Sequence, residues 1–577
     1  MTGLSALPQR TFCFLAVVAL LAACTGQPAT QSIPPTTSST VSSTALEPPT
    51  ELGPTADDAQ VQFTVSLRLP GAADLDRYLH GLVTPGSSSY QHYLAPALFG
   101  ARFGLSDARV AAIVAWLKSG GLSVEVMPQR TSLAVSGSAG QVRQLLGVDL
   151  VDWQNAAGKR YRVPVGEVAV PADLEGDVAA VLGLNTEPLI RPAFVPPVLE
   201  AGAGAGLLPD TVAKAYEIAP LHDAGLHGEG MTIAIVSFDT FTPSDVTLFD
   251  SNFGIHGAPP VDVVHLDGGP DKIGDGAGEV ALDIQVIRGI APQAQIVTYE
   301  GPNSATGFVP TMSRIVADGR AKIVSISWGL CENQSSVQAM QAEQHEFAAA
   351  VAAGISVFTS SGDNAAYDCR QVHISSNNPL ERDLSPGVDW PSASPDVIGV
   401  GGTFLSIRED GSYLEETGWE DPLGGGGGGG GLSAFHTRPD WQVGAGVDNA
   451  ASNGMRQVPD VAGPADPTSG FVVTYTDADQ GLVRGEVGGT SAAAPFWAAS
   501  MLLTQQLAAR EGVAALGPLG PVLYRVSAEQ PAGAVFHDVI RGGNLLYSAG
   551  PGWDYSTGLG TPRVAPLARA IIDLLKR

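Results

Sequence analysis

Four short runs of almost uninterrupted apolar residues constrain the fold of this chain more than any other feature. The runs are MTIAIVSF (231–238), AQIVTYE (294–300), KIVSISWG (322–329) and ISVFTSSG (355–362). Helical patterns lie between them, at Gly278–Gly289 and Ser336–Ala353. Apolar strands that alternate with helices are typical of a parallel sheet covered on both faces. We therefore predict an α/β domain at 209–577, with its active site at the carboxyl ends of the strands.

Residues 58–190 predict a smaller α+β unit. FTVSLRL (63–69) alternates as a strand does, ADLDRYLHGL (73–82) has helical spacing, and Ser106–Lys118 has the pattern of a capped helix. Two strand patterns, one helical pattern and a final strand VDLVDW (148–153) follow. This order favours a ferredoxin-like topology. From the residues alone, a binding module that acts by itself is the alternative.

Residues 191–208 join the two units. They are rich in Pro, Gly and Ala and show no periodicity. Such a composition predicts an exposed linker, and exposed linkers are preferred sites of proteolysis.

The N-terminus carries the pattern of an export signal. Arg10 precedes an apolar run at 11–23 that is too short to span a bilayer comfortably. Residues 1–24 end in LAAC, which resembles the bacterial lipobox, in which the cysteine (here Cys24) is lipidated. An ordinary signal cleaved nearby is the alternative. Residues 25–57 are rich in Ser, Thr and Pro and predict a flexible tether. We expect an extracellular or cell-surface protein that meets the membrane only through lipid on Cys24.

Charge and cysteine content exclude two classes of protein. The chain has 31 Lys and Arg against 58 Asp and Glu, a net charge of −27, which argues against nucleic acid as a partner. Four cysteines in 577 residues exclude a disulfide-dense scaffold. With Cys13 removed and Cys24 lipidated, Cys331 and Cys369 are left to form a disulfide in an exported protein. Two buried thiols are the alternative.

The strongest chemical motif is GGTSAAAP at 488–495. It places Ser491 at the start of an apolar helix, whose N-terminus favours developing negative charge. A helix-capping serine is the alternative, but the pattern resembles the nucleophile signature of subtilisin-like peptidases. A serine nucleophile needs a base. His227-Gly228-Glu229 lacks the His-Gly-Thr context that those enzymes use.

Carboxyl groups supply the candidate base and a candidate donor. Glu279 and Asp283 are four residues apart and share one face of an apolar helix, where two carboxylates do not both ionise readily. A solvated helix face is the alternative. Asp363 ends the motif Ser-Gly-Asp after a strand, where a protonated carboxyl group can donate to an oxyanion. A simple turn aspartate is the alternative.

As a set, these motifs resemble the sedolisin (serine-carboxyl peptidase) family. The segment YQHYL at 90–94 also resembles the activation pro-domain of that family. The resemblance implies a doubly wound, subtilisin-like catalytic domain, a pro-domain that acts as intramolecular inhibitor, and protein or peptide substrates. It makes Ser491 the nucleophile, Glu279 the general base and acid, Asp283 its partner and Asp363 the oxyanion donor of an acid-acting endopeptidase made as a zymogen.

The resemblance also implies one Ca²⁺ ion. Its ligands would be Asp538, Asp554 and the carbonyl groups of Val539, Gly550 and Gly552, hard oxygens that suit this ion. The chain departs from the family pattern in two places: a run of eight glycines at 424–431, and the sequence NAAYD after Asp363.

Two other functions remain as alternatives. A conventional subtilase would use Asp239 with a histidine, but no plausible catalytic histidine is present. An inactive surface-binding protein that kept the fold is disfavoured, because all four reactive positions carry competent residues.

Overall fold

The computed structural model describes most of the chain. The described residues are 48–193, 206–370, 372–373, 381–382, 385–422, 426–513 and 515–577. The predicted signal with Cys24 and residues 194–205 of the predicted linker lie outside these ranges. Within them, no helix is both long enough and apolar enough to cross a lipid bilayer.

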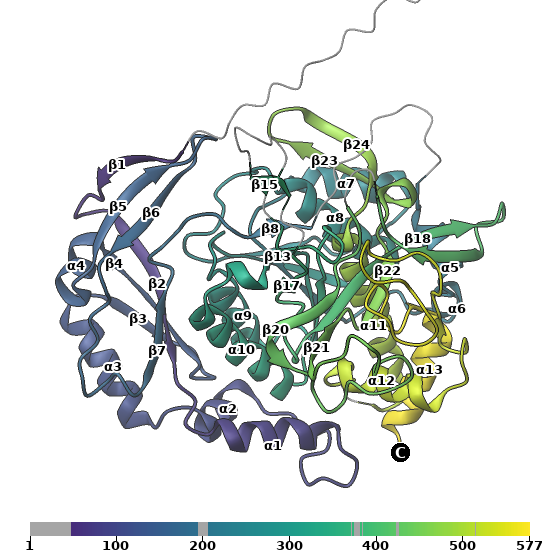
Figure 1. The fold of residues 1–577 in the computed structure, drawn as a ribbon, viewed down its shortest axis with the longest axis horizontal. Helices are drawn as coiled ribbons and strands as arrows, with labels where there is room; N and C mark the ends of the chain where they lie inside the picture. Colours follow the sequence, from purple (N-terminus) through teal and green to yellow (C-terminus); the bar gives the residue numbers. More distant parts are fainter. Residues whose placement is uncertain are drawn as a thin grey trace, which may run out of the picture. The chain divides into compact units, whose positions relative to one another are not determined.

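The larger domain is built around an eight-stranded, mostly parallel sheet (Figure 1). In spatial order the strands are β10 (Asp262–His265), β11 (Gln295–Glu300), β9 (Thr232–Ser237), β12 (Ile323–Ile326), β14 (Ser356–Ser360), β18 (Ile398–Ile407) and β19 (Tyr413–Gly418), with β22 (Val461–Pro464) also on β18. The pairs run parallel except β18 with β19. The predicted α/β architecture is confirmed, because each of the four apolar runs supplies one strand of this sheet.

The larger domain also contains two pairs of helices that pack against each other. Helix α8 (Ala277–Ile290) packs against α11 (Thr490–Arg510), and α9 (Phe308–Asp318) packs against α10 (Val337–Ala352). Helix α11 is buried over almost its whole length, as expected for a helix that is apolar on all sides. The remaining elements of this domain are α5 (Pro209–Ala215), α6 (Ala219–Asp223), α7 (Pro243–Asn252), α12 (Leu519–Glu529), α13 (Val564–Leu575), β13 (Trp328–Cys331), β15 (Val372–His373), β16 (Glu381–Arg382), β17 (Asp389–Trp390), β20 (Gly431–Thr437), β21 (Met455–Val458), β23 (Phe471–Asp477), β24 (Gly481–Val487), β25 (Phe536–His537) and β26 (Thr561–Pro562).

The smaller domain has the predicted ferredoxin-like strand order. Its antiparallel sheet runs β3 (Ser123–Val126), β4 (Ser132–Ser138), β2 (Gln60–Leu67) and β7 (Val178–Leu182), and contacts α3 (Asp107–Ser119) and α4 (Ala139–Leu146). Ser106 caps α3, since its side chain accepts a hydrogen bond from the N–H of Arg109.

Two predictions about this domain were wrong. The run at 148–153 does not supply the last strand of the sheet. It forms β5 (Asp149–Gln154), which pairs with β1 (Thr50–Pro54) and β6 (Arg160–Val165) in a separate sheet. The second concerns the tether predicted at 25–57. Its residues 50–54 form β1, and pairing with β5 satisfies backbone groups that a flexible tether would expose to water.

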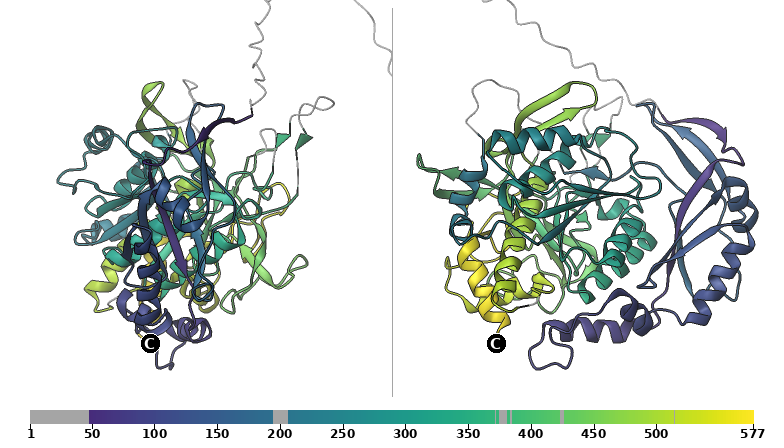
Figure 2. Two further views of the ribbon diagram at one scale, coloured as in Figure 1. Left: turned by 90° about the vertical axis from the view of Figure 1, so that its left-hand side faces the viewer. Right: turned by 180° about the vertical axis from the view of Figure 1, so that it is seen from behind.

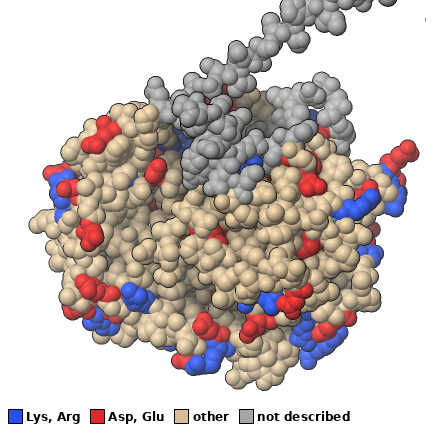
Figure 3. Space-filling view, in the orientation of Figure 1, with Lys and Arg blue, Asp and Glu red and all other residues tan. Residues whose placement is uncertain are grey.

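The smaller domain docks on α9 and α10 of the larger one (Figure 2). Strand β4 contacts α9, while β7, α1 (Ala72–Val83) and α2 (Pro96–Phe103) contact α10. A buried polar cluster lies in this interface: the Gln129 side chain donates to Ser313 and Glu346, and Ser132 Oγ donates to Glu346 at 2.9 Å. On the face shown in Figure 3, acidic and basic side chains are interspersed.

Candidate active site

Ser491 lies in the first turn of α11 and is fully buried. Its Oγ donates a hydrogen bond to Glu279 Oε2 at 2.9 Å, and Ser327 O lies 3.2 Å from the same hydroxyl. The preceding Gly489 has φ +106°, and a Cβ there would lie 2.2 Å from Ala193 O and 2.6 Å from Asp363 Oδ2. Only glycine fits this turn.

Glu279 and Asp283 lie one turn apart on α8, and both are fully buried. Burial raises the pKa of each carboxyl well above its usual range, and the charge of Asp283 raises the pKa of Glu279 further. Ser327 Oγ donates to Asp283 Oδ1 at 2.5 Å, which favours the ionised form of Asp283. Glu279 Oε1 and Asp283 Oδ2 have no hydrogen-bond partner in the described part of the chain. The arrangement suits two carboxyl groups that share one proton.

Asp363 follows β14 at the carboxyl edge of the sheet. The backbone N–H and the hydroxyl of Thr490 donate to Asp363 Oδ1 at 2.7 and 2.8 Å. Burial raises the pKa of Asp363 to about 7, although the bonds from Thr490 oppose this shift. Its Oδ2 is buried and, among the described residues, has no partner. Below neutrality the group is therefore protonated and can donate a hydrogen bond.

The glycine run supports the loop that carries Asp363. Gly427 and Gly429 pack on that loop: Gly427 N–H donates to Asp363 O at 3.0 Å, Gly429 N–H donates to Gly362 O at 2.7 Å, and Ser361 Oγ donates to Gly429 O at 2.7 Å. A Cβ on Gly429 would lie 1.9 Å from Ser361 O. This close approach explains why side chains are missing here.

The start of the predicted linker lies in the cleft rather than in solvent. Strand β8 (Arg191–Pro192) pairs antiparallel with β13, with Pro192 opposite Trp328 and Arg191 opposite Gly329. Ala193 N–H donates to Ser327 O at 3.1 Å, and Ser491 N–H donates to Ala193 O at 3.3 Å. The prediction of an exposed linker was wrong for the backbone of these residues, because β13 satisfies their backbone groups, although the Arg191 side chain is exposed. Composition alone gave no sign of this pairing.

A disulfide joins Cys331, at the end of β13, to Cys369, as predicted. The two Cα atoms are 4.9 Å apart. The bond ties the strand that lines the cleft to the segment that follows Asp363.

The residues of the histidine-dependent alternative lie in other surroundings. Asp239 accepts hydrogen bonds from the N–H groups of Gly274 and Gly276 at 2.9 and 2.8 Å, next to the start of α8. His227 stacks on His222, with ring centroids 5.1 Å apart. In the described chain the Ser491 hydroxyl bonds to a carboxylate and a carbonyl oxygen, and no histidine is among its partners.

The predicted calcium ligands lie around one turn near the C-terminus. Gly552 N–H donates to Asp538 Oδ1 at 3.1 Å, and Gly550 N–H donates to Asp554 Oδ2 at 3.0 Å. Burial raises the pKa of Asp554 to about 6 and also raises the pKa of Asp538. Across the described ranges, no three His, Cys, Asp or Glu side chains come together as a metal cluster. A cation here would need backbone carbonyl groups as further ligands.

Both domains are similar to known protein families. Residues 49–187 match the family model "Pro-kumamolisin, activation domain", and residues 268–516 match the "Subtilase family". The chain is 34% identical over 549 residues to kumamolisin from Bacillus sp. (strain MN-32), covering 90% of this chain and 93% of that protein. It is 31% identical over 536 residues to sedolisin from Pseudomonas sp. (strain 101), covering 88% and 86%. A solved structure of Pseudomonas sedolisin (serine-carboxyl proteinase) with two molecules of pseudo-iodotyrostatin matches with a TM-score of 0.54 at 29% identity, covering 64% of this chain and 99% of that one.

The subtilisin-like fold, the buried serine and these similarities define a serine-type peptidase with an N-terminal activation domain. The chain belongs to the sedolisin family, in which it is similar to kumamolisin and sedolisin along most of its length.

Two further residues of the site were missed or only partly recognised from the sequence. Ser327 lies in the apolar run at 322–329, but nothing in the sequence predicted its bond to Asp283. Thr490, which holds Asp363, lies inside the nucleophile motif, and its position beside Ser491 was the available signal.

Proposed function

We propose that the chain is an acid-acting serine-carboxyl endopeptidase made as a zymogen. Ser491 is the nucleophile, Glu279 the general base and acid, Asp283 its partner, and Asp363 the oxyanion donor. The observation that carries this proposal is the 2.9 Å bond from Ser491 Oγ to Glu279 Oε2, beside a peptide carbonyl that accepts the Ser491 N–H.

The proposed reaction begins when Ser491 Oγ attacks the carbonyl carbon of the substrate and its proton passes to Glu279. The oxyanion that forms accepts hydrogen bonds from the Ser491 N–H and from protonated Asp363. Glu279 then gives its proton to the leaving amine, which departs and leaves an acyl group on Ser491. A water molecule gives a proton to Glu279 and attacks the acyl carbon, and return of that proton to Ser491 Oγ releases the product acid.

Buried Asp283 affects the transfer of the proton between Ser491 and Glu279. Because the two carboxyl groups cannot both ionise readily in a buried site, a proton that leaves Ser491 is shared within the Glu279–Asp283 pair. The pair can then take up and return one proton at a pH where isolated carboxylates are poor bases.

We propose further that maturation removes the pro-domain by cleavage within 190–210, after Ala193. The segment Arg191–Ala193 supports this assignment, since it lies along β13 with its last carbonyl at Ser491, as an acyl-side substrate must. The docked pro-domain then acts as the intramolecular inhibitor.

Two finer features complete the proposal. One Ca²⁺ would be held by Asp538, Asp554 and the carbonyl groups of Val539, Gly550 and Gly552, and its role would be structural. Export through the signal at 1–24 would deliver the chain to an oxidising compartment, which agrees with the disulfide. Lipid on Cys24 would show as loss of the protein from the membrane fraction in Cys24→Ser.

The test of the main proposal is digestion of an unfolded protein at pH 4 and pH 7. The wild type should digest it at pH 4, whereas Ser491→Ala and Glu279→Gln should lose at least about a thousandfold in rate. Substantial activity in Ser491→Ala would exclude this serine as nucleophile.

A further inference from the structure

Strand β8 is not the only attachment of the pro-domain to the larger domain. Helices α1 and α2 and the loop between them (72–103, called the arm below) lie along α10 (Figure 1). We infer that a slot on the larger domain, which holds Tyr93 of the arm, is a second binding site for the pro-domain and retains it after the chain is cut. The inference rests on the proposed function, because it concerns a pro-domain cleaved after Ala193.

The arm and the rest of the pro-domain belong to different hydrophobic cores. The four-stranded sheet packs with α3 and α4 around a cluster of its own, which includes Phe63, Ile113 and Val142. The large side chains of the arm belong to the core of the larger domain, and each is at most 5% exposed: Leu75, Tyr78, Leu82, Phe99 and Phe103. The arm is therefore packed as part of the interior of the larger domain.

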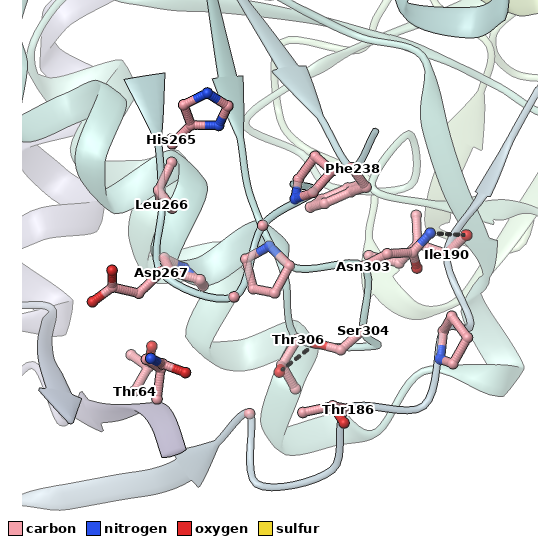
Figure 4. A pocket seen from close by; sticks show the side chains of 18 of the residues that line it. Thr64, Thr186, Ile190, Phe238, His265, Leu266, Asp267, Asn303, Ser304 and Thr306 are labelled. Carbon is pink, nitrogen blue, oxygen red and sulfur yellow. Dashed lines mark hydrogen bonds between the residues drawn. The ribbon is translucent and has the colours of Figure 1, made fainter. Parts of the chain in front are cut away.

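The four-stranded sheet is attached less closely. A cavity of about 1300 Å³ lies between the two domains, lined by Thr64 and Thr186 of the pro-domain and by His265 and Asp267 of the larger domain (Figure 4). Side chains that face such a space make no dispersion contacts across it. The sheet shares with the larger domain one small cluster of buried apolar residues: Leu182, Val309 and Ala342.

Tyr93 projects into a slot whose floor is glycine. A Cβ on Gly354 would lie 2.7 Å from Tyr93 Cγ, and a Cβ on Gly517 would lie 2.0 Å from Tyr93 Oη, so a side chain at either position would displace the ring. Ser356 Oγ donates to Gly517 O at 2.6 Å, which holds the two glycine segments side by side. The sides of the slot are apolar and are lined by Leu516, Pro518 and Val522. This shape fits an aromatic ring.

Hydrogen bonds hold the chain on both sides of Tyr93. Leu94 N–H donates at 2.8 Å to Ala352 O, at the last residue of α10. Gln91 Nε2 donates at 3.1 Å to Leu575 O, at the last residue of α13. Carbonyl groups at the C-terminus of a helix have no partner within that helix. The arm therefore supplies hydrogen bonds that these two helices cannot make for themselves.

The arm also holds this loop in the shape that the slot requires. Tyr78 Oη donates to His92 O, and Gln91 N–H donates to Leu82 O at 3.1 Å. Gln91 has φ +56°, a conformation that residues other than glycine adopt only where their surroundings impose it. A group already held in its bound conformation loses little entropy on binding. We therefore expect Tyr93 to carry a large part of the affinity, as aromatic side chains in closed pockets do.

The slot lies apart from the cleft. Its residues belong to the ends of α10, α12 and α13, whereas Arg191–Ala193 are held by β13 and Ser491. Breaking the bond after Ala193 therefore removes none of the contacts of Tyr93. The pro-domain should leave the enzyme only when the arm leaves the slot.

The test measures cleavage and release separately in full-length protein brought to acid pH at one fixed concentration. A denaturing gel follows cleavage, and gel filtration after increasing times follows release of the cut pro-domain. In the wild type, the cut pro-domain should still elute with the larger domain. Tyr93→Ala should speed its release at least about tenfold, whereas Tyr93→Phe, which keeps the ring, should not. The matched control is Leu98→Ala, on the same arm but 60% exposed, which should release at the wild-type rate.

Two results of this experiment would overturn the inference and leave the peptidase assignment standing. One is a wild-type pro-domain that elutes separately as soon as it is cut, a measurement that needs no variant to fold. The other is release at the wild-type rate in Tyr93→Ala. A wild type that neither cuts itself nor digests an unfolded protein would instead remove the proposed function.

Hydrogen exchange tests the anchor without cleavage. In the uncut Ser491→Ala chain, adding Tyr93→Ala should speed amide exchange within 72–103 at least about tenfold and leave the four-stranded sheet unchanged, because the sheet has a core of its own. Equal exchange with and without the Tyr93 side chain would overturn the inference, whatever the activity of the wild type.

Discussion

Thr490 holds one oxygen of the Asp363 carboxyl group through its N–H and its hydroxyl, while the other oxygen of Asp363 and the carbonyl oxygen of Ala193 approach Gly489 together. The carboxyl group is therefore fixed in direction, and its protonation state alone determines whether it can donate to an oxyanion.

The first prediction follows from that state. The pKa of Asp363 is raised to about 7, so the donor is present below neutrality and is lost as pH rises through this range. We expect activity to peak at about pH 3–5 and to fall toward and above pH 7. Asp363→Asn should move the alkaline limb upward, since an amide donates at any pH. Profiles of kcat/KM against pH check this, and a wild-type optimum above pH 7 would contradict the carboxyl mechanism.

The second prediction concerns maturation. N-terminal sequencing of the acid-treated protein should give Phe194 as the first residue. Ala193→Lys should slow processing at least about tenfold, because Ala193 is only 8% exposed and a charged side chain would be buried there. The exposed Glu175→Lys serves as control. Processing of purified Ser491→Ala without added wild type would show that another agent cuts the chain.

The third prediction concerns the metal. Asp538→Ala with Asp554→Ala should lower Tm, and chelator should lower the Tm of the wild type but not that of the double variant. An ion present at a hundred times its Kd contributes about 2.7 kcal/mol to the free energy of unfolding. Asp479→Ala, in an exposed turn, is the control. If calcium added back after thorough extraction leaves Tm unchanged, the site does not bind it.

The fourth prediction concerns the disulfide. Replacing Cys331 and Cys369 by serine should reduce the free energy of unfolding by about 3–4 kcal/mol, because the bond closes a loop of 38 residues. Denaturation with and without reductant measures this loss. Reductant should leave the serine variant unaffected, and an equal effect on both proteins would mean that it acts elsewhere.

The fifth prediction concerns stability against pH. Burial raises the pKa of Glu343 and Asp389 to about 8 and that of Glu346 and Asp396 to about 7. Each folded-state pKa exceeds the unfolded one, so the contribution of each group to stability is complete below the unfolded pKa, near pH 4, and is lost progressively as pH rises from there through the folded pKa of about 7 to 8.

Tm should therefore be higher at pH 4 than at pH 8. Glu343→Gln should flatten this dependence, whereas the exposed Glu409→Gln should not. A Tm that rises between pH 4 and pH 8 would mean that other groups outweigh these acids.

The sequence predicted those parts of the molecule that local patterns determine. Apolar runs located the sheet. The motifs singled out Ser491, Glu279, Asp283 and Asp363 as candidates, because helix spacing and strand ends are local patterns, and the structure brings these residues together. Long-range pairing was not predictable. Nothing local distinguishes β5, which leaves the ferredoxin-like sheet, from a strand that stays in it. Likewise, Arg191 pairs with β13, a strand that begins more than a hundred residues later in the sequence, so no local pattern could predict this contact.

Because the pro-domain is docked on α9 and α10, we expect cleavage of the chain and the appearance of activity to be two distinct events. If the chain is cut after Ala193, as proposed, the new carboxyl terminus should still lie along β13, because it remains attached to a folded domain that is docked on the larger one. While the chain is intact, this occupant is present at the high local concentration that a covalent tether imposes. Once cut, its occupancy obeys ordinary mass action, and so the delay before activity appears should depend on how far the protein has been diluted.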